Sequence, residues 1–144
     1  MKHLLITFIA LCMYCTCANA QQTISLQQLN GTTWKEVSND APYITLKFTK
    51  TNINDTADYT VGVAVDNYPY YLETKEPTTF SLSKVGKNAT GCYIVKYNTK
   101  IKVFIYYKVV SLKNDTLTLY YEPDENAIGG NSKRGFNIVY KRVK

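Results

Sequence analysis

Residues 101–121 decide the fold, because they read IKVFIYYKVVSLKNDTLTLYY, two alternating runs joined by a polar turn. In the first run, the lysines at 102 and 108 mark the even-numbered positions as outward-facing, so the odd-numbered positions from Ile101 to Val109 face a core. The residues 113–115, Lys-Asn-Asp, favour a tight turn. The second run, Thr116–Tyr121, places Leu117, Leu119 and Tyr121 on its inner face. The stretch therefore predicts an antiparallel hairpin.

The same period-two pattern extends in both directions from this hairpin, and turn-forming residues separate the runs. It predicts eight strands, or nine if Pro69 does not disturb the fourth. The predicted strands are Thr33–Ser38, Tyr43–Thr49, Ala57–Asp66, Tyr70–Glu73, Thr78–Ser83, Gly91–Tyr97, Ile101–Leu112, Thr116–Tyr121 and Phe136–Val143. Only one helical turn is expected, around Ile24–Leu26. Many short strands with tight turns are typical of an antiparallel barrel or sandwich.

The charged positions also predict which side chains face the interior. Besides the hairpin, the inward-facing residues are expected to be Ile44, Leu46, Phe48, Tyr59, Val61, Val63, Val65, Tyr93, Val95, Tyr97, Tyr107, Phe136, Ile138 and Tyr140. Such an interior is rich in tyrosine, and each buried hydroxyl needs a hydrogen-bonding partner. The rings either pack as ordinary core or line a wet or ligand-filled cavity.

The N-terminus predicts export. A positively charged start, an apolar run from Leu4 to Tyr14 and the small residues Ala18-Asn19-Ala20 form the three parts of a secretory signal. Residues 1–20 are therefore expected to be removed, which leaves residues 21–144 as one domain in the periplasm or outside the cell. The apolar run is too short to span a membrane. A lipid anchor on Cys12, Cys15 or Cys17 is less favoured, because no small residue precedes any of them.

Loss of the signal removes most residues that support catalysis. The single histidine, His3, goes with it, and Cys92 is the one remaining cysteine, either buried or reactive. Without histidine there is no Ser-His-Asp or Cys-His arrangement, and no zinc site of the usual kind. The acidic residues in the long loop Glu122–Arg134 have no calcium-loop spacing. We expect no enzyme activity, no metal and no cofactor.

The net charge of +6 comes from basic residues that are scattered along the chain rather than clustered. Nucleic-acid-binding proteins usually carry a basic stripe or patch. The sequence therefore predicts a mildly basic surface and no nucleic-acid partner.

The two ends of residues 21–144 carry a family resemblance. Near the start stands Leu29-Asn30-Gly31-Thr32-Thr33-Trp34-Lys35, and near the end the hairpin is followed by a closing strand, Phe136–Arg142. This pattern resembles the small lipocalin-like proteins exported by Bacteroidetes-type bacteria. The resemblance implies an eight-stranded up-and-down barrel, with Trp34 closing one end beneath Arg142 through a cation–π contact. The spacing in this sequence is Gly-x-x-Trp, whereas the family has Gly-x-Trp. The alternative interpretation is that Trp34 is an ordinary core residue and that Arg142 is an ordinary terminal charge.

Two functions follow from this sequence. The first is a non-catalytic binding protein that holds a small, largely apolar ligand inside the barrel, against Tyr93, Tyr107, Tyr121 and Tyr140. The second is a protein-interaction module, an envelope-assembly component or an inhibitor, whose filled barrel acts through its loops and exposed tyrosines. The run Tyr68-Pro69-Tyr70-Tyr71 favours the second function if its rings lie on the surface.

Overall fold

The structure is a computed structural model, and it describes residues 21–123 and 135–144. The predicted signal peptide and most of the loop predicted at Glu122–Arg134 lie outside the described residues. The elements are β1 (Ile24–Ser25), α1 (Leu26–Leu29), β2 (Thr33–Glu36), β3 (Tyr43–Phe48), β4 (Asn52–Tyr59), β5 (Gly62–Glu73), the 3-10 helix η1 (Leu82–Lys84), β6 (Thr90–Gly91), β7 (Tyr93–Asn98), β8 (Val103–Lys113), β9 (Thr116–Tyr121) and β10 (Phe136–Val143).

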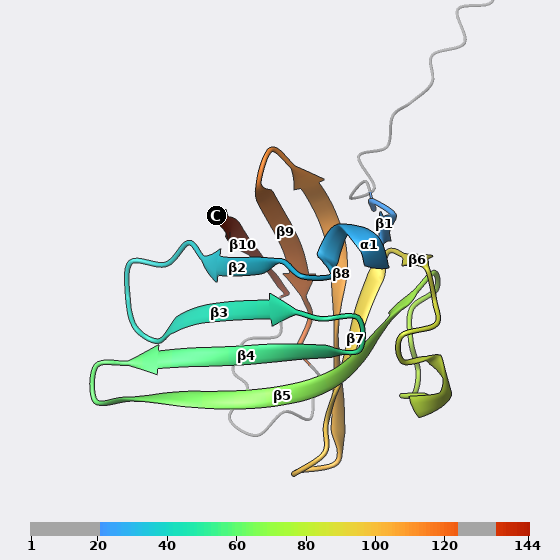
Figure 1. Cartoon of the computed structure of the whole chain (residues 1–144), viewed down its shortest axis with the longest axis horizontal. Coiled ribbons are helices and arrows are strands. Elements are labelled where there is room, and N and C mark those ends of the chain that lie inside the picture. The colour runs from blue at the N-terminus through green and yellow to red at the C-terminus, as the bar shows by residue number, and fades with distance from the viewer. Residues whose placement is uncertain (1–20, 124–134) are drawn as a thin grey trace, which may run out of the picture.

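Eight of these strands close into one antiparallel barrel, as the sequence predicts (Figure 1). Around the barrel the order is β2-β3-β4-β5-β7-β8-β9-β10, and β10 returns to pair with β2. Strands β1 and β6 form a separate two-stranded sheet beside the barrel. Closure removes most of the unpaired strand edges that an open sheet would expose to other chains.

The short helix α1 covers one end of the barrel, which we call the closed end. Ser25 caps the helix: its side chain accepts a hydrogen bond from the Gln28 N–H, and the Gln28 side chain accepts one from the Ser25 N–H. Leu29 at the end of this helix is fully buried and packs in the same cluster as Trp34 and Phe48. Helix α1 therefore completes the hydrophobic core rather than lying free on the surface.

The strand predicted at Ala57–Asp66 is wrong, because a hairpin turn divides it. Strand β4 ends at Tyr59, residues 60–61 make the turn, and β5 begins at Gly62. The turn residues Thr60 and Val61 give no glycine, proline or asparagine signal before Gly62. The predicted interior positions Val61, Val63 and Val65 are 95%, 62% and 63% exposed. Val61 lies in the turn, and the register places Val63 and Val65 beside Asp58 and Thr56 on the outer face of the barrel.

Strand β5 runs through Pro69 and includes the separate strand predicted at Tyr70–Glu73. The Tyr70 N–H donates to the Thr51 carbonyl on the β4 side, so the Pro69 nitrogen points to the opposite side. On that side the ladder with β7 begins only at Tyr70. The proline therefore lies at a position of β5 where a missing N–H breaks no ladder bond, which is how the strand tolerates it.

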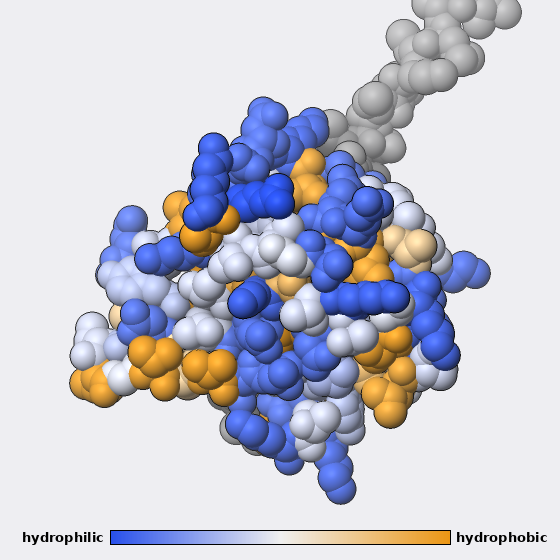
Figure 2. Space-filling view, viewed as in Figure 1, coloured by the Kyte–Doolittle hydropathy of each residue, from blue (hydrophilic) through white to orange (hydrophobic). Residues whose placement is uncertain are grey.

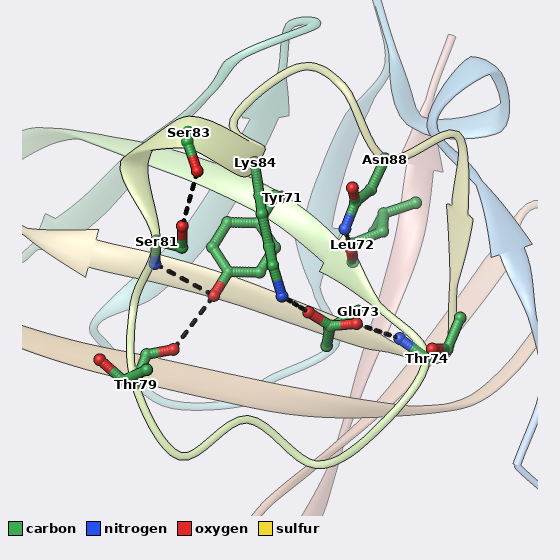
Figure 3. A network of polar contacts seen from close by, with 9 residues as sticks. All are labelled: Tyr71, Leu72, Glu73, Thr74, Thr79, Ser81, Ser83, Lys84 and Asn88. Carbon is green, nitrogen blue, oxygen red and sulfur yellow. Dashed lines mark hydrogen bonds and ion pairs between the residues drawn. The ribbon is translucent and has the colours of Figure 1, made fainter.

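The strand predicted at Thr78–Ser83 is also wrong. Residues 74–89 form an irregular segment with η1, which packs on the outer face of β5 and β7 (Figure 3). The Tyr71 hydroxyl donates to the Thr79 carbonyl at 3.1 Å and accepts from the Ser81 N–H at 3.3 Å. Lys84 pairs with Glu73, and the Asn88 side-chain amide donates to the Leu72 carbonyl. The Tyr71 side chain of β5 thus satisfies two backbone groups of the segment that would be paired in a ladder if the segment were a strand.

The predicted direction of the β7 side chains is reversed. Ile94 and Lys96 face the interior, whereas Tyr93, Val95 and Tyr97 face outward. Inward positions for Tyr93, Val95 and Tyr97 would turn Lys96 to the outer face, but its charge is buried and paired inside the barrel. The Cys92 thiol, which precedes β7, is buried and donates to the Thr74 carbonyl.

The inward positions predicted for the last three strands of the barrel are correct where the core is packed. Val109, Leu117, Leu119 and Tyr140 are buried in the main cluster, with Tyr107 and Ile138 packed against it. Ile101 instead lies in the turn before β8, where it is exposed. The predicted hairpin β8–β9 is present, with the turn at Asn114 and Asp115 in the left-handed backbone conformation that these residue types tolerate.

Candidate functional site

At the closed end, Trp34 is buried beneath Arg142. The guanidinium carbon of Arg142 lies 5.9 Å from the centroid of the Trp34 ring, within the range of a cation–π contact. The indole N–H donates to the Thr32 hydroxyl at 2.7 Å, and this hydroxyl donates to the Leu29 carbonyl. The contact expected between Trp34 and Arg142 is therefore present, and Trp34 is linked to α1 through Thr32.

Halfway along the barrel, the interior holds an ion pair. The Lys96 ammonium lies 2.8 Å from Asp55 and is 5% exposed as a residue. It also lies 4.7 Å from the centroid of the Tyr68 ring and 5.3 Å from that of Tyr107. Burial alone would lower the pKa of Lys96, but Tyr107 and Asp55 raise it above its ordinary value. We call these four residues, Asp55, Tyr68, Lys96 and Tyr107, the polar layer. In it, the buried ion pair lies beside two aromatic rings.

Two further ionisable groups lie beside the polar layer. Glu36 is half-buried and pairs in register with Tyr140 across β2 and β10. Burial and the nearby Asp55 raise the pKa of Glu36. Burial also raises the pKa of Tyr107 and of Tyr140, so both hydroxyls stay protonated at neutral pH and can donate hydrogen bonds.

Beyond the polar layer, the barrel leads to its open end, opposite α1. The register turns Ile105, Ile138 and Tyr121 inward there, and each is only partly buried. Val103 and Phe136 also face inward, yet they are 47% and 50% exposed. Val103 and Phe136 are the first residues of β8 and β10, so their exposure lies at the rim of the open end.

Aromatic rings connect the polar layer to the open end. The Tyr107 and Tyr121 centroids are 5.5 Å apart with the planes tilted by 45°, and Tyr121 meets Phe136 edge-to-face at 5.8 Å. Such pairs hold one another in place, because the positive edge of one ring faces the negative face of the next. The three rings form one continuous apolar wall from Lys96 to the mouth.

The barrel wall is incomplete between β5 and β7 at this end. Only Tyr70–Glu73 of β5 pair with β7, and no strand among the described residues pairs with that edge of β5 between Gly62 and Pro69. Lys100, in the turn after β7, reaches Asp66 of β5 at 2.5 Å. The ion pair Lys100–Asp66 and the contact of Lys96 with Tyr68 are the side-chain bridges across this gap.

Of the four tyrosines predicted to line a ligand site, Tyr107, Tyr121 and Tyr140 lie inside the barrel. Tyr93 does not: it faces outward, packs edge-to-face against Tyr106 at 6.0 Å and borders a hollow on the outer surface. The reversed direction of β7 is the reason.

Sequence reasoning missed Asp55 and Lys96. The predicted strands leave Asp55 outside and turn Lys96 to the outer face, and only their pairing inside the barrel explains why both are tolerated there. Their opposite charges were visible in the sequence, but nothing there brings positions 41 residues apart together.

Within residues 21–123 and 135–144, no group of three or more histidine, cysteine, aspartate or glutamate side chains could hold a metal ion. No helix in the same residues is long and apolar enough to cross a membrane. Neither ionisable cluster described above is arranged as a metal site.

The chain thus belongs to the class of closed, eight-stranded antiparallel β-barrels. Comparisons with family models, with curated proteins and with solved structures gave no match.

Proposed function

We propose that this chain is an exported, non-catalytic binding protein that holds a small, largely apolar ligand in the open half of its barrel. One observation carries the proposal: inward-facing apolar side chains are fully buried at the closed end but stay accessible at the open end, above the Lys96–Asp55 pair. A concave apolar site with a few buried polar groups is the usual form of a small-molecule pocket.

The proposed ligand has an apolar body and at least one hydrogen-bonding group. Its body would contact the wall formed by Tyr107, Tyr121 and Phe136. Its polar group would approach the polar layer or the Tyr140 hydroxyl. Because Asp55 already compensates the charge of Lys96, a neutral polar group fits this site better than a carboxylate.

The finer identity that we propose is a lipocalin-like barrel in the periplasm or outside the cell. Two features support it: eight barrel strands in sequence order, and a tryptophan near the first barrel strand beneath an arginine of the last. Both are features of the family that the sequence resembles. The secretory signal peptide proposed at residues 1–20 would direct the protein to export.

Native mass spectrometry tests the function directly. The mature protein, residues 21–144, is purified gently from its own host and compared with the denatured protein. We expect an extra mass of a few hundred daltons that is lost on denaturation. The Tyr121→Ala variant should lose this mass, whereas Tyr43→Ala, which changes a tyrosine on the outer face of β3, should keep it. A wild-type protein with no extra mass, or equal binding by both variants, would contradict an interior site.

The alternative function, a protein-interaction module, loses the feature that first favoured it. Tyr70 and Tyr71 are 0% and 2% exposed, and Tyr68 faces the interior, so the run Tyr68–Tyr71 is no contact surface.

A different observation favours that alternative: the unpaired edge of β5. The backbone N–H groups of Val63, Val65 and Asn67 point away from β4, toward the gap. Figure 2 shows hydrophobic side chains on the same hairpin, which the exposed residues Val61, Val63 and Val65 supply. An extended segment of a partner protein could add to such an edge as a strand.

A photo-crosslinker tests this alternative. We replace Val63 with p-benzoylphenylalanine and irradiate the protein in its host, with the same replacement at Tyr43 as the control. One defined adduct at position 63, absent at 43 and abolished by Val65→Pro, is expected of strand addition. The same adducts at both positions would reject it.

A further inference from the structure

The outer face of the barrel carries an unusual number of aromatic residues. Outward positions of β7, β8 and β9 hold Tyr93, Tyr97, Phe104, Tyr106 and Tyr120. On a sheet that packs one face on a core, the other face is normally polar. Tyr97 has a structural explanation, because it stacks on Phe80 of segment 74–89 at 4.8 Å. No such cover accounts for Tyr93, Tyr106 and Tyr120 among the described residues.

These three tyrosines surround a hollow of about 230 Å³. Polar side chains stand between them: Glu76, Lys108 and Asn137 all line the same hollow. Glu76 belongs to segment 74–89, Glu122 follows directly on β9, and the other lining residues come from β7, β8, β9 and β10. The hollow is thus built from strands of the barrel and lies on the opposite side of the wall from the interior site.

The rings around the hollow are held in fixed positions. Tyr93 meets Tyr106 edge-to-face at 6.0 Å, and Phe104 stacks on the other side of Tyr106 at 6.3 Å. The Tyr106 hydroxyl donates to the Glu76 carboxylate at 2.7 Å. That hydrogen bond and partial burial raise the pKa of Tyr106, so its hydroxyl remains a donor at neutral pH. Ordered rings lower the entropic cost of binding.

Tyr120 is positioned by a glycine. A Cβ atom on Gly135 would lie 2.2 Å from the Tyr120 hydroxyl, so a side chain at this position would displace the ring from the place that it has in the structure.

We infer that this outer hollow binds a sugar in its pyranose form. A pyranose has an apolar C–H face, which packs on aromatic rings, and hydroxyl groups around its edge. Here the rings supply the apolar surface, Glu76 and Glu122 supply acceptors, and Lys108 and Asn137 supply donors. Charges of both signs favour a neutral ligand over an ion. The volume is below the roughly 300 Å³ of drug-sized pockets, which suits a single sugar ring.

Saturation-transfer NMR with the methyl glycosides of glucose, galactose, mannose and N-acetylglucosamine tests this inference on the mature protein. We expect at least one glycoside to receive saturation from tyrosine ring protons. Tyr106→Ala should weaken its binding about tenfold, as loss of a central aromatic contact usually does. Tyr106→Phe, which keeps the ring but loses the bond to Glu76, should weaken it less.

Two controls separate loss of the site from loss of the fold. Asn137→Ala changes an exposed residue at the rim and should weaken binding with an unchanged thermal transition. Tyr43→Ala, on the outer face of β3, should leave binding unchanged. If none of the four glycosides binds, or if one binds equally to the wild type, Tyr106→Ala and Asn137→Ala, the inference is wrong.

A second arm identifies the source of the sugar. The glycoside that binds best is offered as a free oligosaccharide and as the same sugar attached to a peptide. Tighter binding of the free oligosaccharide indicates a soluble saccharide, and tighter binding of the glycopeptide indicates a glycoprotein. Binding of either at the Tyr106 site supports the inference, and binding of neither contradicts it.

Discussion

At the scale of single residues, the buried Lys96–Asp55 pair distinguishes this barrel from one with an apolar interior. Two charges inside a protein lose most of their hydration, and their attraction repays this loss only while both partners are present. The exposed pair Lys100–Asp66 differs, because water solvates either partner when the other is removed. Both pairs join a lysine in or just after β7 to an aspartate of β4 or β5, so they form a matched comparison.

Removal of the Lys96 charge should therefore destabilise the protein strongly. Lys96→Met leaves the Asp55 carboxylate largely buried and unpaired, and we expect the free energy of unfolding to fall by about 3 kcal/mol. Lys100→Met should lower it by less than about 1 kcal/mol. Urea unfolding of both variants measures the difference. Equal losses would mean that the interior pair is solvated like the surface pair.

Glu36 gives a prediction with a pH dependence. Its pKa is raised in the folded protein by burial and by Asp55. The folded state therefore binds a proton more tightly than the unfolded state, and its stability decreases as the pH rises through the two pKa values. Glu36→Gln removes this ionisation, so the variant should be more stable than the wild type at pH 7. The advantage should disappear below the unfolded pKa of about 4.3.

Thermal unfolding at pH 7 and at pH 3.5 checks this prediction. Asp58→Asn is a suitable control, because Asp58 lies on the same sheet at the exposed end of β4. A stabilisation of the Glu36 variant that is the same at both pH values would exclude ionisation as its cause.

At the scale of elements, the crossing of β6 over the end of β5 depends on Gly91. A Cβ atom at this position would lie 2.6 Å from the Glu73 backbone nitrogen and 2.7 Å from its carbonyl oxygen. Backbone atoms in a ladder cannot move aside as a flexible side chain can. The segment is fixed there by the hydrogen bond from the Cys92 N–H to the same carbonyl.

Gly91→Ala should therefore destabilise the protein by about 1–3 kcal/mol, as overpacking does. Gly62→Ala is the matched control, because a Cβ atom at Gly62 meets nothing within 4 Å. The control should be neutral or slightly stabilising, since alanine reduces the entropy of the unfolded chain. The urea unfolding midpoints of the two variants measure the difference. Similar losses of stability in both variants would mean that β5 and β6 can move apart at no cost in free energy.

The elements also indicate which parts of the fold the sequence can reveal. The strands β3, β9 and β10 were predictable, because apolar and polar residues alternate between clear turn signals. The β4–β5 hairpin was not, because its turn has a valine where a turn residue is expected and β4 begins with polar residues typical of a turn. Segment 74–89 resembles a strand locally, but two of its backbone groups bond to the Tyr71 hydroxyl and others bond to one another around η1, so no ladder forms.

The candidate site shows the same limit. The inward positions of Tyr107, Tyr121 and Tyr140 follow from alternation within one strand each. The inward position of Lys96 depends on a partner from another strand, and alternation carries no information about such a partner. A rule that places every lysine on the outer face fails where a carboxylate pairs with the lysine inside the barrel. Here the rule predicted the wrong face of the barrel wall for Tyr93.

At the scale of the whole molecule, the two halves of the barrel differ in how completely they are buried and paired. The closed half contains the fully buried cluster and is covered by α1. The open half has the projecting β4–β5 hairpin, an unpaired stretch of β5 and partly exposed interior side chains. Regions with few buried contacts open locally at low free energy, while core strands open only on global unfolding.

Amide hydrogen exchange should therefore divide the barrel across its strands rather than between them. In β3 and β9 the amides of Phe48 and Leu117 should be protected up to the global free energy of unfolding, whereas those of Tyr59 and Ala64 in the hairpin should exchange by local opening. A ligand in the open half should slow exchange at Ile105 and Ile138, because their local opening releases it, and at Phe48, because ligand binding raises the global free energy of unfolding. Unchanged exchange at Ile105 and Ile138 would contradict a ligand in the open half. Uniform protection without ligand would mean that both halves are packed alike, and the accessible interior on which the proposed function rests would then not exist in solution.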